Sequence, residues 1–367
     1  QAADAKSAAQ TAEAKAVASA AAADDARAAA VSAEQKAAQA ERRTAQLEDE
    51  LRATQRLARE LMLRSQPTLP QLSSGELYDV ERLQGSEGDN SKRFEAAWKV
   101  RGTSVKRAVV IKENDSPTAT ELMVNLRAAA KPHPNIVAFL GICPDFEEAS
   151  SDKAPCLVFE KASVGSVANA IDQKINLGSP LQWALQIAKG VAHLHSLDIL
   201  HRDLAARNVL VTLDSLNKQP ILQLCDFGHA RFVEKLKGKY RAGFSMTSPR
   251  WSAPESLLRE EYSEKSDAWM FAVTVWEILN ECKQEPFYQI SDDAFEAKAI
   301  HATGDAIQAG CKQRRGVHWL GSSLPASCPP ALEKVLFDCW QFDPAKRPQM
   351  KDIIAEVKGA RSCFESR

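Results

Sequence analysis

The pattern of apolar and polar positions divides the chain into two regions. Up to about residue 65, Ala alternates with charged residues and Gln, and 24 of the first 60 residues are Ala. Ala has the highest helix propensity, so this region is predicted to form one long helix. The spacing of a coiled-coil seam is found at Leu47, Leu51, Thr54, Ala58 and Leu61. Two interpretations stay open for it: a solvated single helix, or a helix that self-associates or binds a partner helix.

After this region the pattern becomes that of a mixed domain. Pro67 and Pro70 stop the helix and indicate a short linker. Strand-like apolar runs, such as 107–112, come before helical patterns, such as 181–194. Strands followed by helices favour an α+β domain in two parts. The predicted boundaries of the Ala-rich helix, linker, β-rich lobe, helical lobe and tail are 1–65, 66–75, 76–160, 161–360 and 361–367.

Charge and hydropathy limit the classes of partner. The chain has 47 Lys and Arg residues against 48 Asp and Glu residues, a formal net charge of -1. We therefore expect no overall basic field that would attract nucleic acid or an anionic membrane. We also find no apolar stretch long enough to span a bilayer. A cytoplasmic location is the default expectation, although a chain that starts at Gln1 can be a fragment lacking a targeting or membrane segment.

Three motifs follow one another in the second half of the chain. Residues 201–208 read His-Arg-Asp-Leu-Ala-Ala-Arg-Asn, residues 226–228 read Asp-Phe-Gly, and residues 253–255 read Ala-Pro-Glu. Together they resemble the catalytic loop, the metal-binding motif and the end of the activation segment of eukaryotic protein kinases. The resemblance covers about residues 76–360. It implies a bilobal α+β fold, with a small, mainly antiparallel β lobe that carries one key helix and a larger helical lobe.

The resemblance also assigns the transfer chemistry. Phosphoryl transfer depends on positioning the nucleophile and neutralising phosphate charge. Asp203, assisted by Arg207, would accept the proton of a protein hydroxyl. Asn208 and Asp226 would offer oxygen ligands to two Mg²⁺ ions, with Mn²⁺ as an alternative. The separation of Asp203 and Asp226 slightly exceeds the usual one, which predicts a longer turn at 217–220 between two strands.

The ATP site is assigned from the first part of the domain. Residues 108–112 resemble the strand that carries the ATP-binding lysine, here Lys112, with Val110 where Ala is usual. Lys112 would hold the α- and β-phosphates and pair with Glu121, provided that a longer loop at 128–132 follows the helix. Only Gly85 and Gly88 remain of the glycine-rich phosphate loop. The residues expected around adenine are the gatekeeper Phe159, the hinge residues Glu160 and Ala162, and Leu210 beneath the ring.

The later segments 265–269 and 339–348 also resemble kinase segments. By that match Asp267 braces the catalytic loop, and Glu255 forms a buried ion pair with Arg347. Arg202 suggests control by phosphorylation of the activation segment. The candidate acceptors there are Tyr240, Ser245 and Thr247.

The class of substrate hydroxyl stays open. With Arg207, the catalytic loop resembles the form found in tyrosine kinases. Residues 247–255, in contrast, resemble the tyrosine-kinase-like (TKL) group of serine/threonine kinases. In that group the position of Ser248 carries a hydroxyl that meets the catalytic Asp. We therefore favour protein substrates phosphorylated on Ser or Thr, with tyrosine or dual specificity as the alternative. A pseudokinase scaffold and a coiled-coil adaptor are the competing classes of function.

Overall fold

The computed structural model describes residues 71–83, 92–100, 102–113, 119–146, 155–233, 240–241, 248–287 and 324–365. The chain divides into two units, Gln1–Arg64 and Ser65–Arg367, and all the described residues belong to the second unit. The Ala-rich helix predicted for residues 1–65 lies outside the described residues, so that it stays a prediction.

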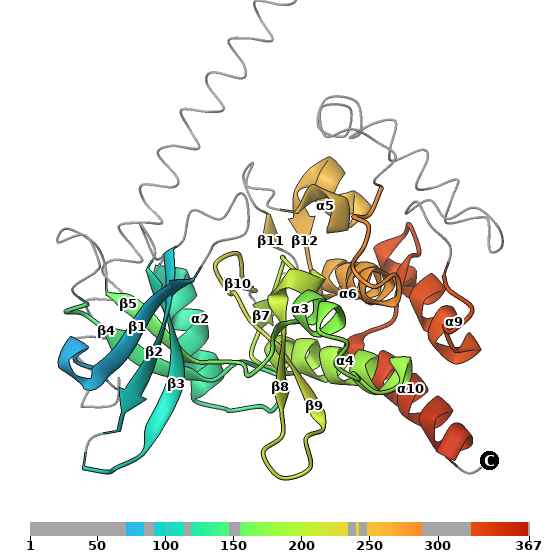
Figure 1. The fold of residues 1–367 in the computed structure, drawn as a ribbon. Helices are drawn as coiled ribbons and strands as arrows, with labels where there is room; N and C mark the ends of the chain where they lie inside the picture. Colours follow the sequence, from blue (N-terminus) through green and yellow to red (C-terminus); the bar gives the residue numbers. More distant parts are fainter. Residues whose placement is uncertain are drawn as a thin grey trace, which may run out of the picture. The chain divides into compact units, whose positions relative to one another are not determined.

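The first lobe is an antiparallel sheet of five strands accompanied by one helix (Figure 1). The strand order is β1-β2-β3-β5-β4. In β3, Val109 and Ile111 are fully buried and pack in the core of this lobe, because alternate side chains of a strand point to the same face. The elements are η1 (Ser74–Glu76), β1 (Leu77–Leu83), β2 (Lys92–Lys99), β3 (Lys106–Glu113), α2 (Ala119–Ala129), β4 (Phe139–Cys143) and β5 (Cys156–Glu160).

The residues just before β1 belong to this lobe. Leu72 is buried in the core of the lobe, and its backbone N–H donates to Ile142 O at 2.9 Å. The carboxylate of Asp145 accepts hydrogen bonds from the Ser73 hydroxyl and from the Ser74 N–H, both at 3.0 Å. We call this set of contacts the Asp145 clip. The last residues of the predicted linker are therefore folded against β4.

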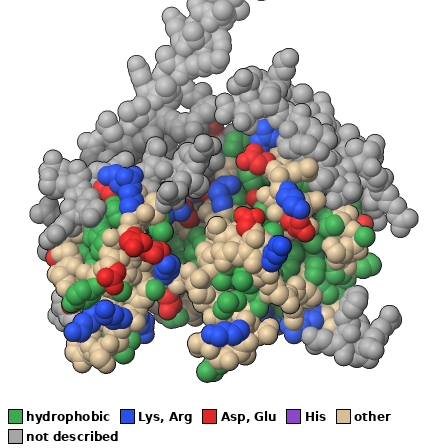
Figure 2. Space-filling model, viewed as in Figure 1, with side chains coloured by type: hydrophobic (Ala, Val, Ile, Leu, Met, Phe, Trp, Pro, Cys, Tyr) green, Lys and Arg blue, Asp and Glu red, His purple; other side chains and the backbone are tan. Residues whose placement is uncertain are grey.

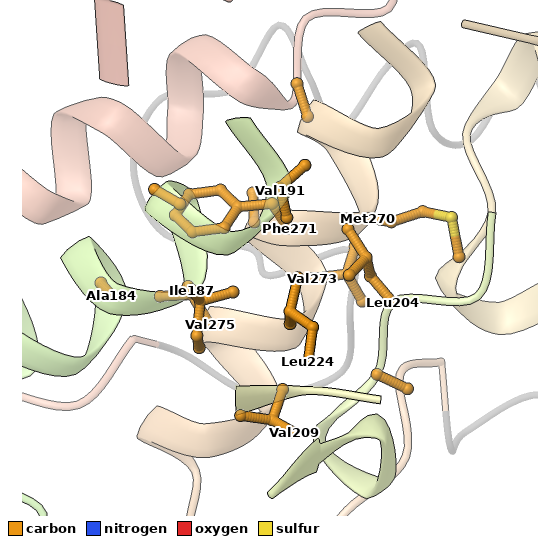
Figure 3. Close-up of a cluster of buried hydrophobic side chains, with 14 of the residues drawn as sticks. Ala184, Ile187, Val191, Leu204, Val209, Leu224, Met270, Phe271, Val273 and Val275 are labelled. Atoms are coloured by element: carbon orange, nitrogen blue, oxygen red, sulfur yellow. The ribbon is translucent and has the colours of Figure 1, made fainter. Parts of the chain in front are cut away.

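The second lobe is mainly helical and holds the larger core. Ser179 caps α4, with Pro180 in the first turn, as a helix start requires. Helix α6 is apolar on almost every side and lies in the middle of the lobe, packed against α4 and the strands β8 and β9 (Figure 3). The helices are α3 (Val167–Asp172), α4 (Pro180–Ser196), α5 (Pro254–Arg259), α6 (Glu264–Leu279), α9 (Pro330–Cys339) and α10 (Met350–Glu365).

Short strands and 3-10 turns shape the loops of this lobe. Three small sheets form, with the strand orders β6-β8-β9, β10-β7 and β11-β12. The strands are β6 (Gly165–Ser166), β7 (Ile199–Leu200), β8 (Val209–Leu213), β9 (Pro220–Leu224), β10 (Arg231–Phe232), β11 (Tyr240–Arg241) and β12 (Glu261–Tyr262). The 3-10 turns are η2 (Ala206–Asn208), η3 (Pro249–Trp251) and η4 (Pro344–Lys346).

The spacing of the motifs predicted a longer turn at 217–220 and a longer loop at 128–132. Both connections are present, at slightly different residues. The turn between β8 and β9 spans 214–219, where Asp214 accepts the N–H groups of Leu216 and Asn217, so that Pro220 begins a strand rather than ending the turn. Helix α2 continues through Ala129, so that the loop expected at 128–132 starts only at Ala130. In both places local hydrogen bonds, which spacing alone does not reveal, fix where the element ends.

The predicted α+β bilobal fold is confirmed. On the face drawn in Figure 2, acidic and basic side chains are interspersed over the described residues rather than separated by sign. Within the described part of the chain, no helix combines the length and the apolar character needed to cross a membrane.

Candidate active site

Three charged side chains from different elements form the first cluster of the site. Lys112 in β3 places its Nζ 3.0 Å from Oε1 of Glu121 in α2. The same nitrogen lies 2.9 Å from Oδ1 of Asp226, which follows β9. Asp226 has a φ of 61°, a conformation uncommon outside glycine. The structure therefore brings Lys112, Glu121 and Asp226 together, with Glu121 reaching Lys112 despite its early position in the sequence.

The carboxylates determine the charge of Lys112. Burial disfavours the charged amine, but Asp226 and Glu121 outweigh burial and raise the pKa of Lys112 above its ordinary value. Burial also opposes ionisation of Asp226, yet Lys112 and then Arg93 hold its pKa well below the usual range. Near neutral pH Lys112 is therefore cationic and Asp226 anionic, which suits the cluster to bind phosphate and metal.

The carboxylate of Asp203 is the centre of the second cluster. Its Oδ1 accepts hydrogen bonds from Nη2 of Arg207, at 2.9 Å, and from the hydroxyl of Ser248. The Ser248 hydroxyl in turn accepts one from Arg207. Its Oδ2 accepts one from Nδ2 of Asn208 at 2.8 Å. These contacts hold the carboxylate in one orientation, as a general base requires.

Asp267 in α6 holds the backbone of the catalytic loop in place. This fully buried carboxylate accepts the backbone N–H groups of His201, at 2.9 Å, and Arg202, at 3.1 Å. It also bonds to Nε2 of His195 at 2.9 Å. Burial opposes its ionisation, but His195 and then His201 lower the pKa of Asp267. The prediction that Asp267 braces the catalytic loop is confirmed.

Asn208 and Asp226 fit the chemistry of a Mg²⁺ site. The backbone N–H of Cys225 donates to Asn208 O at 3.0 Å, which places the two candidate ligands on adjoining segments. The amide nitrogen of Asn208 donates twice to Asp203, so the amide oxygen is the atom left to bind a ligand. The Asp226 side chain is 23% exposed and already faces the cationic groups of Lys112 and Arg93. Hard oxygen ligands of this kind are those that Mg²⁺ prefers.

The residues predicted around adenine lie on β3 and β5 of the first lobe, just after β5, and on β8 of the second lobe. Val110 and Phe159 are partners in the register of β3 and β5, and Phe159 is half-buried. The N–H of Glu160, at the end of β5, donates to Ala138 O at 2.9 Å. Ala162 is buried just beyond β5, and Leu210 lies in β8.

The remaining predicted residues are incompletely described. Gly85 and Gly88, of the phosphate loop, lie outside the described residues, as do Ser245 and Thr247 of the activation segment. Tyr240 is described through its backbone in β11. The phosphate loop at Gly85 and Gly88 therefore stays a prediction.

Two residues of the site were not predicted from the sequence. Arg93 in β2 places Nη2 3.2 Å from Oδ2 of Asp226, and nothing in the strand pattern distinguishes it from a solvated residue. Glu277 in α6 accepts the backbone N–H of Ala206 in the catalytic loop at 2.9 Å. The sequence could have marked Glu277 as unusual, because it is the only charged residue in the apolar segment 268–279.

Comparison with known proteins identifies the family. Residues 82–357 match the family described as "Protein tyrosine and serine/threonine kinase". The chain is 30% identical over 290 residues to "Probable serine/threonine-protein kinase drkD" of Dictyostelium discoideum, which covers 76% of this chain and 19% of that protein. It is 29% identical over 267 residues to "Dual specificity protein kinase pyk3" of the same organism, covering 71% and 17%. It is also 30% identical over 282 residues to "Mitogen-activated protein kinase kinase kinase 10" of Mus musculus, covering 74% and 27%.

The chain therefore belongs to the eukaryotic protein kinase superfamily, since the matched family spans well over half of its residues. The relatives are named for serine/threonine and for dual specificity, so similarity alone leaves the class of hydroxyl unresolved. The chain spans less than a third of the length of these relatives.

Proposed function

We propose that this chain is an active ATP-dependent protein kinase that phosphorylates Ser and Thr residues of protein substrates. The observation that carries the proposal is the formed ion pair between Lys112 and Glu121, with Asp226 on the same amine. A protein kinase needs this pair and the metal-binding Asp in place for transfer.

Each residue has a defined part in the proposed reaction. When bound, ATP supplies the γ-phosphoryl group, and two Mg²⁺ ions, or Mn²⁺, neutralise the charge on its phosphates. Lys112 binds the α- and β-phosphates, while Asn208 and Asp226 hold the metal ions. Asp203 accepts the proton of the substrate hydroxyl at its carboxylate, with Arg207 beside it to orient the carboxylate. Gly85 and Gly88 are proposed to cover the phosphates, and Val110, Phe159, Glu160, Ala162 and Leu210 to surround the adenine.

The contacts of Ser248 support Ser and Thr as acceptors. Its hydroxyl donates to Asp203 and accepts from Arg207, so an aliphatic hydroxyl already occupies hydrogen-bonding positions beside the proposed base. We infer that an incoming Ser or Thr hydroxyl joins this arrangement. The resemblance of residues 247–255 to the TKL group points the same way, and tyrosine or dual specificity is the alternative.

We also propose that phosphorylation of the activation segment regulates the kinase. The guanidinium of Arg202, next to Asp203, stacks on the ring of Tyr262 at 4.0 Å. Tyr262 in β12 pairs in register with Tyr240 of the activation segment. This register supports Arg202 as the partner of an added phosphate, which would order the segment by a charge-assisted contact.

For residues 1–65 we propose a coiled coil that brings kinase domains of about residues 76–360 together. Self-association raises the effective concentration of neighbouring domains and favours phosphorylation between them. The proposal rests on the heptad spacing from Leu47 to Leu61. Deletion of residues 1–65 is expected to lower autophosphorylation at low protein concentration, and equal rates with and without the segment would refute it.

The decisive experiment is phosphoamino-acid analysis of the chain after incubation with radiolabelled ATP and Mg²⁺. We expect phosphoserine and phosphothreonine in the parent and no incorporation in Asp203→Asn. Thermal stabilisation by ATP and Mg²⁺ should persist in that variant, because Lys112 and Asp226 are intact. Phosphotyrosine alone would exclude the Ser/Thr assignment, and stabilisation without any incorporation by the parent would identify a pseudokinase.

A further inference from the structure

A second acidic residue of α6, besides Asp267, contacts the catalytic loop. Glu277, near the end of α6, is the only charged residue among residues 268–279. Burial raises the pKa of Glu277, which shows that its surroundings oppose the charged form. A carboxylate kept in such a position requires specific partners.

One oxygen of Glu277 joins two segments of the active site. Its Oε2 accepts the backbone N–H of Ala206 in η2, at 2.9 Å, and the indole N–H of Trp251 in η3, at 2.8 Å. Ala206 belongs to the catalytic loop, whereas Trp251 follows Ser248 at the end of the activation segment. The distance between these segments is thus fixed through a shared acceptor.

Both segments lead directly to the proposed reacting groups. The guanidinium of Arg207 stacks on the Trp251 ring at 4.8 Å and donates to Oδ1 of Asp203 at 2.9 Å. Ala206 is the residue immediately before Arg207 in the chain. A shift of Trp251 or of Ala206 would therefore move Arg207, and with it the orientation of the Asp203 carboxylate.

We propose that Glu277 is a positioning residue for phosphoryl transfer, which acts as a shared hydrogen-bond acceptor for Ala206 and Trp251. The proposal rests on the proposed kinase activity. Neither hydrogen-bond donor to Glu277 is among the groups proposed to bind ATP, so Glu277 governs the turnover rate rather than the affinity for nucleotide. The acceptor oxygen is what matters, and Gln at this position can supply one whereas Met, of similar size, cannot.

The test compares steady-state kinetics on a Ser-containing peptide for the parent, Glu277→Gln and Glu277→Met. A displacement of about 1 Å near the reacting atoms can cost about 100-fold in rate. We expect kcat of Glu277→Met to fall about 10- to 100-fold on this basis, with the KM for ATP unchanged and most of kcat restored in Glu277→Gln. The control is Glu281→Gln, because the Glu281 side chain is 59% exposed and pairs with Lys283 in the turn after α6; its kinetics should match the parent.

A second variant and a second readout guard against loss of folding. Trp251→Phe keeps a ring beneath Arg207 but removes the indole N–H, and its kcat should fall less than that of Glu277→Met. Amide exchange of the peptide containing Ala206 should be faster in Glu277→Met than in the parent. Unchanged kcat in both Glu277→Met and Trp251→Phe would overturn the proposal, as would a rise in the KM for ATP with kcat preserved. If the parent is inactive, the proposed function is refuted instead. In that case, equal amide exchange of the Ala206 peptide in Glu277→Met and in the parent would overturn the positioning role as well.

Discussion

The buried ion pair between Glu255 and Arg347 gives a prediction whose size can be worked out from the geometry. Arg347 donates from Nη1 and Nη2 to the two carboxylate oxygens of Glu255, each at 2.7 Å. Its other donors reach three backbone carbonyls, those of Gln341, Lys265 and Phe342, at 2.7, 2.9 and 3.1 Å. The Arg347 side chain has no exposure to solvent and the Glu255 side chain is 5% exposed. The ion pair predicted from the sequence is confirmed.

Glu255→Ala removes the only carboxylate of this pair and leaves the guanidinium buried. The three carbonyl contacts remain, but they carry no full negative charge. Removal of one partner of a buried pair typically costs about 3–5 kcal/mol. Since domains are stable by only about 5–15 kcal/mol, this is a large share of the free energy of unfolding. At about 2–4 °C per kcal/mol for larger domains, the melting temperature should fall by at least about 6 °C.

The assay is urea unfolding followed by tryptophan fluorescence, supported by thermal melting. The matched control is Lys334→Ala, which removes a cation that bridges Asp338 at 2.9 Å and Glu356 at 2.6 Å while 62% exposed. Exposed pairs contribute about 0–1 kcal/mol, so this variant should remain close to the parent. If Glu255→Ala and Lys334→Ala lose similar amounts of stability, the reasoning from burial is wrong.

Two further predictions concern the second lobe. Gly190→Ala in α4 should destabilise the domain, because an added Cβ would lie 2.8 Å from Asn135 O. Gly359 in α10 has open space around it, so Gly359→Ala should stabilise the domain by about 0.5–1 kcal/mol through helix propensity. Opposite signs in urea unfolding support the close approach at Gly190, and two stabilised variants contradict it. Asp267 has a lowered pKa in the folded state, so its contribution is complete above the unfolded pKa of about 3.9 and is lost as pH falls through the folded value. The stability difference between the parent and Asp267→Asn should therefore shrink below about pH 4, and a constant difference from pH 7 to pH 3 would contradict this assignment.

The sequence predicted most of the fold and the central residues of the site. Asp203, Asn208 and Asp226 were assigned through the resemblance of residues 201–208 and 226–228 to kinase motifs, and phosphoryl transfer explains why those residue types are needed. Glu121 was the difficult case, since its spacing from the next motif is unusual. The sequence assigned Glu121 on the assumption of a longer loop at 128–132, and the structure shows the pair with Lys112 and the end of α2 at Ala129.

Other features depend on contacts that no local pattern encodes. Arg93 reaches Asp226 because β2 and β3 pair in a register that sets Arg93 opposite Lys112. The shared acceptor role of Glu277 needs the three-dimensional meeting of α6, the catalytic loop and η3. A linear pattern can mark such a residue as unusual, as it does for an acid within an apolar helix, but it cannot name the partners.

The Asp145 clip determines where an independently folding piece of this chain has to begin. Similarity to the kinase family starts at residue 82, which falls inside β1 (Leu77–Leu83). A truncation at that point would remove most of an edge strand together with Leu72, and would leave the acceptor atoms of Asp145 and Ile142 facing water. Recombinant versions intended for crystallisation or inhibitor screening should therefore start no later than Gln71, even though the residues before β1 show no kinase signature.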